Sequence, residues 1–259
     1  MIKHVAFIMD GNRRWARKWH LPLAAGHTKG YQAIEPLIAY AVKKKIKYVT
    51  FWAFSTENWN RDKKEVELLL QIFRRIFQGE IIRRLHKNGV KINILGEIDA
   101  FPKDLSDKIK DLVEQTKNNT AITVNIGLNY GGRAEIVHAV NKILALHNSH
   151  PGKRSASRIS HVTAVRDSGQ VMIPHSGTRM TDKLEISEED FSKYLYTKDQ
   201  PDPDLIIRTG AEQRLSGFLP WQSIYSELYF PEVFWPDFNE KEFEKAIDEF
   251  EKRKRRFGT

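Results

Sequence analysis

A short polar segment near the amino terminus combines residue types that bind phosphate groups and metal ions. It follows an apolar run and holds one carboxylate, one glycine, one amide and two guanidiniums: Asp10, Gly11, Asn12, Arg13 and Arg14. Backbone N–H groups at a strand-to-helix turn bind phosphate, and arginine forks match its oxygens. The same turn is as consistent with Asp10 capping a helix beside solvated arginines. Taken alone, this segment leaves both interpretations open.

Two further polar segments follow apolar runs in the same way. The first holds Ser55, Asn58, Trp59 and Arg61, and the second holds Arg208, Arg214 and Ser216. The first can also be interpreted as a capped turn with Trp59 in the core. Two arginines and a serine suit the oxygens of a diphosphate. Since the chain has no cysteine and no serine–histidine arrangement is evident, the three segments together favour diphosphate binding with a metal.

Alternating strands and helices must position these segments. Apolar runs that end in glycine or polar turn residues predict buried strands at residues 4–9, 48–54, 91–95, 122–128 and 205–207. A helical period predicts one helix over residues 66–85, and Asn239 with Glu242 predicts the start of a last helix. The alternation predicts an α/β fold, a single domain with a central, mainly parallel sheet flanked by helices. Ligands of such sheets lie beyond the carboxyl ends of the strands.

Composition sets further expectations. A length of 259 residues with 41% hydrophobic side chains fits one domain over residues 1–259, and the aperiodic, Ser-, Gly- and His-rich stretch 148–182 predicts a mobile loop insertion. The net charge of +9 comes entirely from residues 148–183 and 252–256, so nucleic acid is not an expected partner. Without a signal peptide or a long apolar run, the chain is expected to be cytoplasmic.

Several motifs appear in the order typical of one known family. They are His4–Asn12, Gly26-His27-x-x-Gly30, Ser55-x-x-Asn58-Trp59-x-Arg61, Asn129–Arg133, Arg208–Gly210, Glu227–Phe230 and Arg256-x-Gly258. On these motifs the sequence resembles the cis-prenyltransferase family, whose members include undecaprenyl diphosphate synthases and isoprenyl transferases. The resemblance implies the cis-prenyltransferase fold. It also implies condensation of isopentenyl diphosphate with an allylic diphosphate, farnesyl diphosphate being the expected primer, to form a cis-polyprenyl diphosphate.

The resemblance also implies roles for individual residues. Asp10 would bind Mg²⁺ together with a substrate diphosphate, and Glu227, from the neighbourhood of the partner subunit, would help to position the metal. Asp10 and Asn58 would act in catalysis. The allylic and reacting-centre residues would be Gly11, Asn12, Arg13, Arg14, Trp15, His27, Ser55, Trp59 and Arg61. Isopentenyl diphosphate would be bound by Arg208, Arg214 and Ser216. The enzyme would be a homodimer in which Arg256 and Gly258 reach across the interface, and product release would bring peripheral contact with the inner face of the membrane.

Four residues depart from the family pattern. Arg13 stands where glycine is usual, and Leu23 where many members have arginine. Ala211 and Gln213 replace a common glycine and a common histidine. These changes bear on the preferred allylic substrate more than on the type of reaction.

Two other functions are compatible with parts of the sequence. The first is another metal-dependent phosphate enzyme, such as a hydrolase with Asp10 as nucleophile, although Asn12 stands where a second aspartate would support it. The second is a non-catalytic module, either a nucleic-acid binder or the accessory subunit of a two-protein prenyltransferase. Accessory subunits typically lose the Asp10-type residues, which this chain keeps.

Overall fold

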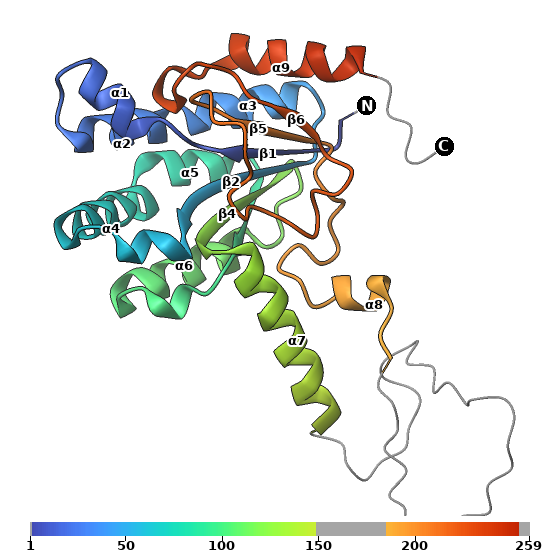
Figure 1. The fold of residues 1–259 in the computed structure, drawn as a ribbon. Coiled ribbons are helices and arrows are strands. Elements are labelled where there is room, and N and C mark those ends of the chain that lie inside the picture. The colour runs from blue at the N-terminus through green and yellow to red at the C-terminus, as the bar shows by residue number, and fades with distance from the viewer. Residues whose placement is uncertain (1, 149–184, 254–259) are drawn as a thin grey trace, which may run out of the picture. The chain divides into compact units, whose positions relative to one another are not determined.

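A computed structural model describes residues 2–148 and 185–253 of the chain. The strands are β1 (His4–Ile8), β2 (Tyr48–Ser55), β3 (Val90–Leu95), β4 (Ile122–Tyr130), β5 (Leu205–Arg208) and β6 (Glu227–Tyr229). They form one six-stranded sheet in the order β3-β4-β2-β1-β5-β6, and every pairing is parallel. Figure 1 shows β1, β2 and β5 side by side in the middle of this sheet. The prediction of a mainly parallel sheet is confirmed.

Helices connect the strands. They are α1 (Asn12–Lys18), α2 (Leu23–Gln32), α3 (Ile34–Lys43), α4 (Lys63–Gln78), α5 (Glu80–Lys87), α6 (Lys103–Thr116), α7 (Gly132–Asn148), α8 (Glu188–Ser192) and α9 (Glu240–Lys252). Short 3₁₀ helices occur at η1 (Thr56–Asn60), η2 (Ile98–Ala100) and η3 (Trp235–Asp237). At the start of α9, the Asn239 side chain accepts hydrogen bonds from the backbone N–H groups of Lys241 and Glu242, at 3.0 and 3.3 Å. The predicted start of the last helix is therefore confirmed.

One helix was predicted where two are found. The expected helix over residues 66–85 is divided at Gly79, which has an extended backbone with φ −80° and ψ 167°. Glycine is unfavourable in the interior of a helix, because its backbone loses more conformational freedom there than that of any other residue. Gly79 both ends α4 and precedes α5, so the apolar stripe of α4 belongs to a helix of its own.

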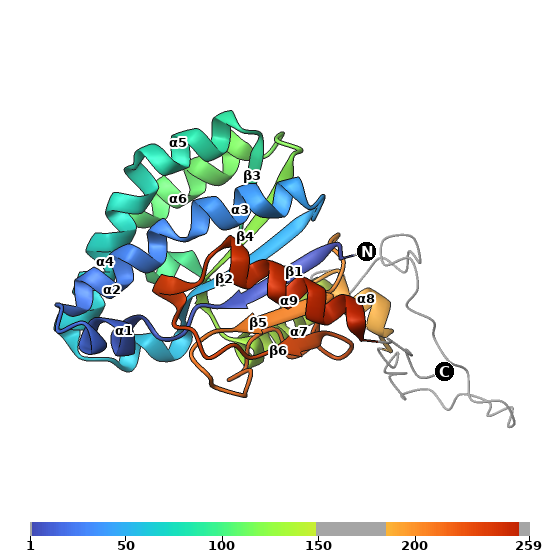
Figure 2. The same ribbon diagram turned by 90° about the horizontal axis from the view of Figure 1, so that it is seen from above.

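The hydrophobic core lies between one face of the sheet and the helices that cover it. Val5, Phe7 and Phe51 point from the strands into a cluster that includes side chains of α3, α4, α6 and α9. In Figure 2, α3 and α9 cross over the strands on this face. Side chains alternate between the two faces of a strand, so His4 and Thr50 lie on the other face, where His4 Nε2 is 2.7 Å from Thr50 Oγ1.

The chain divides into two compact units. The first comprises Met1–Glu135 with Gln200–Thr259 and contains the sheet, and the second is Ile136–Asp199. Within the second unit, the rings of His138 and Tyr196 stack at 5.2 Å. Apart from Asn148, the predicted loop at 148–182 lies outside the described residues. The single-domain prediction stays a prediction.

Candidate active site

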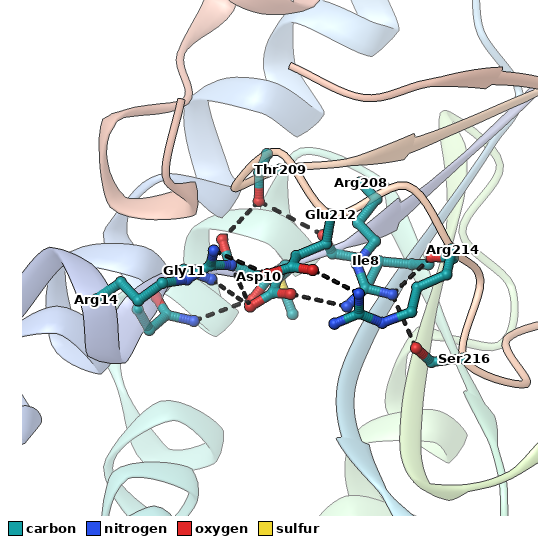
Figure 3. A network of polar contacts seen from close by, with 11 residues as sticks. Ile8, Asp10, Gly11, Arg14, Arg208, Thr209, Glu212, Arg214 and Ser216 are labelled. Atoms are coloured by element: carbon teal, nitrogen blue, oxygen red, sulfur yellow. Dashed lines mark hydrogen bonds and ion pairs between the residues drawn. The ribbon is translucent and has the colours of Figure 1, made fainter. Parts of the chain in front are cut away.

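The first and third polar segments meet because their strands are neighbours. Ile8 at the end of β1 is in register with Arg208 at the end of β5. The chain turns immediately after each strand, which places Asp10 beside the Arg208 guanidinium (Figure 3). Parallel strands bring their carboxyl ends to one edge of the sheet, so residues almost two hundred positions apart contact each other there.

Three positively charged or polarised groups contact the carboxylate of Asp10. Its Oδ2 accepts a hydrogen bond from Arg208 Nη2 at 2.8 Å, its Oδ1 accepts one from the Gly11 N–H at 2.6 Å, and Arg14 Nη2 lies 3.3 Å from Oδ1. Burial alone would raise the pKa of Asp10, but the hydrogen bond and charge of Arg208, the charge of Arg14 and the Gly11 N–H together lower it below its usual value. Asp10 is therefore a carboxylate at neutral pH.

Arg208 is almost fully buried and organises the loop that follows β5. Its side chain is 7% exposed, and Nη1 donates to the Arg214 carbonyl at 2.6 Å and to Ser216 Oγ at 2.8 Å. Ala211 and Ser216 both have left-handed backbone conformations, with φ 63° and 53°. Such conformations cost side chains other than glycine on the order of 1 kcal/mol each and persist where the surroundings enforce them. Arg208 thus holds a strained loop in place.

The turn after β1 needs glycine for two reasons. Gly11 has φ 103°, and a Cβ at this position would lie 2.7 Å from a ring carbon of Phe234. The turn leads into α1, which carries Arg14 back towards the loop after β5. There Arg14 Nη1 donates to Glu212 Oε1 at 3.0 Å (Figure 3).

The second polar segment forms an adjacent wall of the site. Asn58 Nδ2 donates to Ser55 Oγ at 2.9 Å, and the Ser55 N–H donates to Asn58 Oδ1 at 3.2 Å. Arg61 pairs with Glu65 at 2.9 Å, and Arg13 lies 3.6 Å from the same carboxylate oxygen. The guanidinium of Arg13 is therefore held beside Arg61 by a carboxylate that is only 10% exposed.

His27 is a neutral imidazole within this wall. Its Nε2 is buried and has no hydrogen-bond partner among the described residues. Burial and the charge of Arg61 lower the pKa of His27 to about 4, and Arg13 acts in the same direction against the opposing charge of Glu65. At neutral pH it can donate or accept a hydrogen bond without adding charge.

The depressed pKa of His27 predicts a loss of stability in acid. The fold favours the uncharged ring, whereas the unfolded chain takes up a proton below pH 6.5, so the free energy of unfolding should fall as the pH drops from 6.5 towards 4. The loss from His27 should be on the order of 3 kcal/mol. Burial also lowers the pKa of His4 to about 4, so His4 adds to the effect in the same window.

Urea unfolding between pH 7 and pH 4 measures this dependence. A His27→Gln variant should show a shallower decline than the wild-type chain. Equal slopes for the wild-type and His27→Gln proteins would contradict the assignment.

A cavity of about 290 Å³ opens among these residues. Its polar lining includes Asp10, Asn12, His27, Ser55, Asn58, Arg61, Arg208 and Ser216. Its apolar lining includes Leu69, Ile72, Phe73 and Ile76, which share one face of α4. A polar set of residues thus adjoins an apolar wall, as a ligand with an anionic head and a hydrocarbon tail requires.

Two predicted site residues, both tryptophans, lie outside the lining of the cavity. Trp15 is buried and its Nε1 donates to Asp237 at 2.8 Å, while Trp59 packs against Phe54 at 4.9 Å between ring centres. Neither of these two described indoles lines the cavity. For Trp59, this position matches the alternative interpretation as a core residue.

Glu227 lies at the opposite edge of the sheet from Asp10. It begins β6 in register with Leu205, which pairs with Val5 at the start of β1, and it accepts a hydrogen bond from Arg253 at 2.8 Å. Asp10 and Glu227 of one chain are therefore not brought together. Arg256 and Gly258 lie outside the described residues.

Among the described residues, Asp10 is the acidic side chain that lines the cavity. Within residues 2–148 and 185–253, no three His, Cys, Asp or Glu side chains gather into a metal site. Mg²⁺ is commonly held by one or two carboxylates together with substrate phosphates and water. Asp10, which is ionised and lines the cavity, fits a metal that binds together with a diphosphate.

Two acidic residues of the site were not predicted. Glu65 and Glu212 each bind two of the predicted arginines. Glu65 stands four residues after Arg61, a spacing that pairs side chains on a helix and could have indicated it. Glu212 is 198 residues from Arg14, so no local spacing indicates that contact.

Comparison with known proteins places this fold and site. A family model described as putative undecaprenyl diphosphate synthase matches residues 8–258. The chain is 43% identical to an isoprenyl transferase of Fusobacterium nucleatum, over 99% of this chain and 95% of that protein. It is 42% identical to the ditrans,polycis-undecaprenyl-diphosphate synthase ((2E,6E)-farnesyl-diphosphate specific) of Pasteurella multocida, over 99% and 94%.

Solved structures agree with the sequence matches. Lavandulyl diphosphate synthase from Lavandula x intermedia, in complex with dimethylallyl diphosphate, aligns with a TM-score of 0.83 at 29% identity, over 100% of this chain and 98% of that one. A probable undecaprenyl diphosphate synthase from Campylobacter jejuni aligns with a TM-score of 0.74 at 28% identity, over 100% and 99%.

Fold and matches together define an enzyme of the cis-prenyltransferase class. More narrowly, the chain belongs to the undecaprenyl diphosphate synthase family, whose curated members include isoprenyl transferases. The predicted fold and the predicted family are confirmed. Among the described residues, no helix has the length and apolar character needed to cross a bilayer.

Proposed function

We propose that this chain elongates farnesyl diphosphate by cis condensation with isopentenyl diphosphate, releasing diphosphate at each step. The observation that carries this proposal is the cavity in which the Asp10–Arg208 pair adjoins the apolar face of α4. The farnesyl specificity in the name of the Pasteurella multocida relative supports the choice of primer.

The two substrate diphosphates are proposed to bind to different residues of the site. Gly11, Asn12 and Arg14, with Arg13 beside them, bind the allylic diphosphate, whose C–O bond breaks. Arg208, Arg214 and Ser216 bind the isopentenyl diphosphate, whose alkene attacks the allylic carbon before a proton leaves. Charge-assisted hydrogen bonds of this kind contribute roughly 1.5–3 kcal/mol each. Those made to the allylic group act on a departing diphosphate, so they stabilise the transition state more than the bound substrate.

We propose Mg²⁺ as the metal. Asp10 would hold it, and when bound it would neutralise the charge of the diphosphate. Asn58 and Ser55, which fix each other by two hydrogen bonds, hold their polar groups at the reacting centre. His27 adds a neutral hydrogen-bonding group beside the allylic diphosphate. Glu227 can take part only from a second subunit, because in one chain it lies at the opposite edge of the sheet.

An elongation assay tests the proposal. Purified protein is incubated with labelled isopentenyl diphosphate, farnesyl diphosphate and Mg²⁺, and the products are sized after dephosphorylation. Polyprenyl products with new cis double bonds are expected. Absence of any elongation would favour the accessory-subunit alternative instead.

The apolar face of α4 should influence product length. Ile72 is buried and lines the cavity, so Ile72→Trp should fill part of the space that the growing chain occupies. We expect shorter products at a comparable rate of the first condensation, measured by chromatography of the dephosphorylated alcohols. Gln71→Trp places the same side chain on the exposed side of α4 and is the control. An unchanged product distribution in Ile72→Trp would remove α4 as a wall of the product site.

The proposed enzyme is a homodimer. In the second compact unit, Val137, Val140 and Leu144 of α7 are 58%, 41% and 45% exposed and recur at helical spacing. Such a stripe on one face of a helix is typical of an interface. In the proposed dimer, Arg256 and Gly258 of one chain reach the site of the other.

Light scattering after size-exclusion chromatography tests the dimer. The expected mass is twice the chain mass of 30.1 kDa. Val140→Asp should raise the dissociation constant at least about tenfold, since a buried unpaired charge opposes association. The exposed Asn141→Asp serves as a control of equal charge. A monomeric wild-type protein would contradict the proposal.

The hydrocarbon nature of the proposed product bears on where the enzyme works. A product made of many isoprene units favours release into a bilayer, since each buried CH₂ group contributes about 0.8 kcal/mol. We therefore place the enzyme in the cytoplasm, in peripheral contact with the inner face of the membrane. Co-sedimentation with anionic vesicles is the measurement that checks this contact.

A further inference from the structure

Glu212 lies between two arginines that belong to different halves of the proposed site. Its Oε1 accepts a hydrogen bond from Arg14 Nη1 at 3.0 Å, and its Oε2 lies 2.5 Å from Arg214 Nη1. Figure 3 shows its carboxylate among these guanidiniums. Its side chain is 29% exposed, so the two contacts are partly shielded from water.

The two contacts belong to a longer series of alternating charges. Arg208 binds Asp10, Asp10 contacts Arg14, Arg14 binds Glu212, and Glu212 binds Arg214. The series closes where Arg208 Nη1 donates to the Arg214 carbonyl at 2.6 Å. If Asp10 is engaged by a metal, Glu212 is the carboxylate that still holds Arg14.

The backbone fixes where Glu212 can reach. The N–H groups of Gly210 and Ala211 donate to the carbonyls of Val233 and Pro231, at 2.8 and 3.0 Å. Both residues have positive φ, 83° and 63°. This anchored, left-handed turn presents the next residue, Glu212, to α1 instead of to solvent.

A carboxylate between two guanidiniums does two things. It offsets their mutual repulsion, and it fixes the distance between them. Each guanidinium has five N–H donors in a planar fork, so Arg14 and Arg214 can stay on Glu212 and still donate to phosphate oxygens.

We propose that Glu212 is a positioning residue that couples the allylic and isopentenyl diphosphate sites by holding Arg14 and Arg214 at a fixed separation. The inference rests on the proposed function, which assigns these arginines to different substrates. Without Arg214, the charge of Glu212 is balanced by Arg14 alone, so the carboxylate repels the allylic diphosphate and competes with it for Arg14. Without Glu212, the state of the isopentenyl diphosphate site no longer affects binding at the allylic diphosphate site.

A double-mutant cycle tests the coupling. The measured quantity is the dissociation constant of farnesyl thiodiphosphate, a poorly ionising allylic analogue, determined by calorimetry with no isopentenyl diphosphate present. Arg214→Ala should weaken this binding at least about threefold in the wild-type background. In the Glu212→Gln background, the same replacement should have no effect. Glu212→Gln alone should lower kcat about tenfold without weakening analogue binding, because it removes orientation and negative charge together.

The controls separate the possible failures. Glu67→Gln neutralises an exposed glutamate that pairs with Arg74 on α4 and should leave both quantities unchanged. Melting curves identify any variant that does not fold, and Glu212→Ala, which also removes the charge, then takes the place of Glu212→Gln in the cycle. If the wild-type protein neither binds the analogue nor elongates farnesyl diphosphate, the proposed function fails. If it does both, and Arg214→Ala weakens analogue binding equally with and without the Glu212 carboxylate, only the proposed coupling is wrong.

Discussion

Replacement of Asp10 by alanine should reduce elongation by at least about a thousandfold. The expected loss exceeds that of a single hydrogen-bond donor to a developing anion, which is about a hundred- to a thousandfold. Asp10 is both the ionised carboxylate proposed to hold Mg²⁺ and a partner of the Arg208 guanidinium. The rate of incorporation of labelled isopentenyl diphosphate measures the effect.

Two controls make this result interpretable. Removing Asp10 leaves Arg208 buried with one partner fewer, which destabilises a fold, so the melting temperature of Asp10→Ala must be measured beside its activity. Asp107→Ala removes an exposed carboxylate that pairs with Lys103 and should retain full activity. Wild-type elongation by a folded Asp10→Ala protein would remove Asp10 from the mechanism.

Replacement of Arg208 by lysine should raise the KM for isopentenyl diphosphate about a hundredfold. The guanidinium uses two nitrogens to contact Asp10, Ser216 and the Arg214 carbonyl at once. An ammonium is a point charge on a flexible stem and cannot reproduce this planar geometry. The loop after β5 should lose its fixed conformation although the positive charge remains.

The comparison that isolates geometry from charge is Arg214→Lys. Arg214 is 61% exposed and, within the part of the chain that the structure describes, its side chain makes one ion pair, so its replacement by lysine should raise the same KM only a few-fold. Initial rates at varied isopentenyl diphosphate concentration measure both variants. Equal effects at the two positions would show that charge alone determines binding there.

The strand framework was predictable because buried parallel strands are short and apolar throughout. The predicted strands at 4–9 and 122–128 differ from β1 and β4 by one or two residues at one end. β6 was not predicted as a strand, since three residues that begin with a glutamate carry no apolar pattern. The division at Gly79 was missed because the apolar period continues across it through Ile82 and Leu85.

Predicting the site was harder, because it depends on contacts between distant segments. The sequence placed Asp10 and Arg208 after separate strands, and only the order of the sheet makes those strands neighbours. The register of β6 with β5 puts Glu227 at the other edge, a fact that no motif contains. The indole of Trp15 turns to Asp237, a contact across 222 positions.

The break at Gly79 has a mechanical consequence for an enzyme whose product grows. Arg84 of α5 is fixed to Glu35 of α3 by two hydrogen bonds of 2.7 and 2.6 Å, whereas α4 carries the cavity wall. One continuous helix would have to bend along its length to accommodate a longer hydrocarbon, and bending strains many backbone hydrogen bonds. Because the helix is interrupted at Gly79, a displacement of α4 need not pass to α5 through continuous helical hydrogen bonds, so the cavity wall and the helix fixed to α3 are mechanically separate segments.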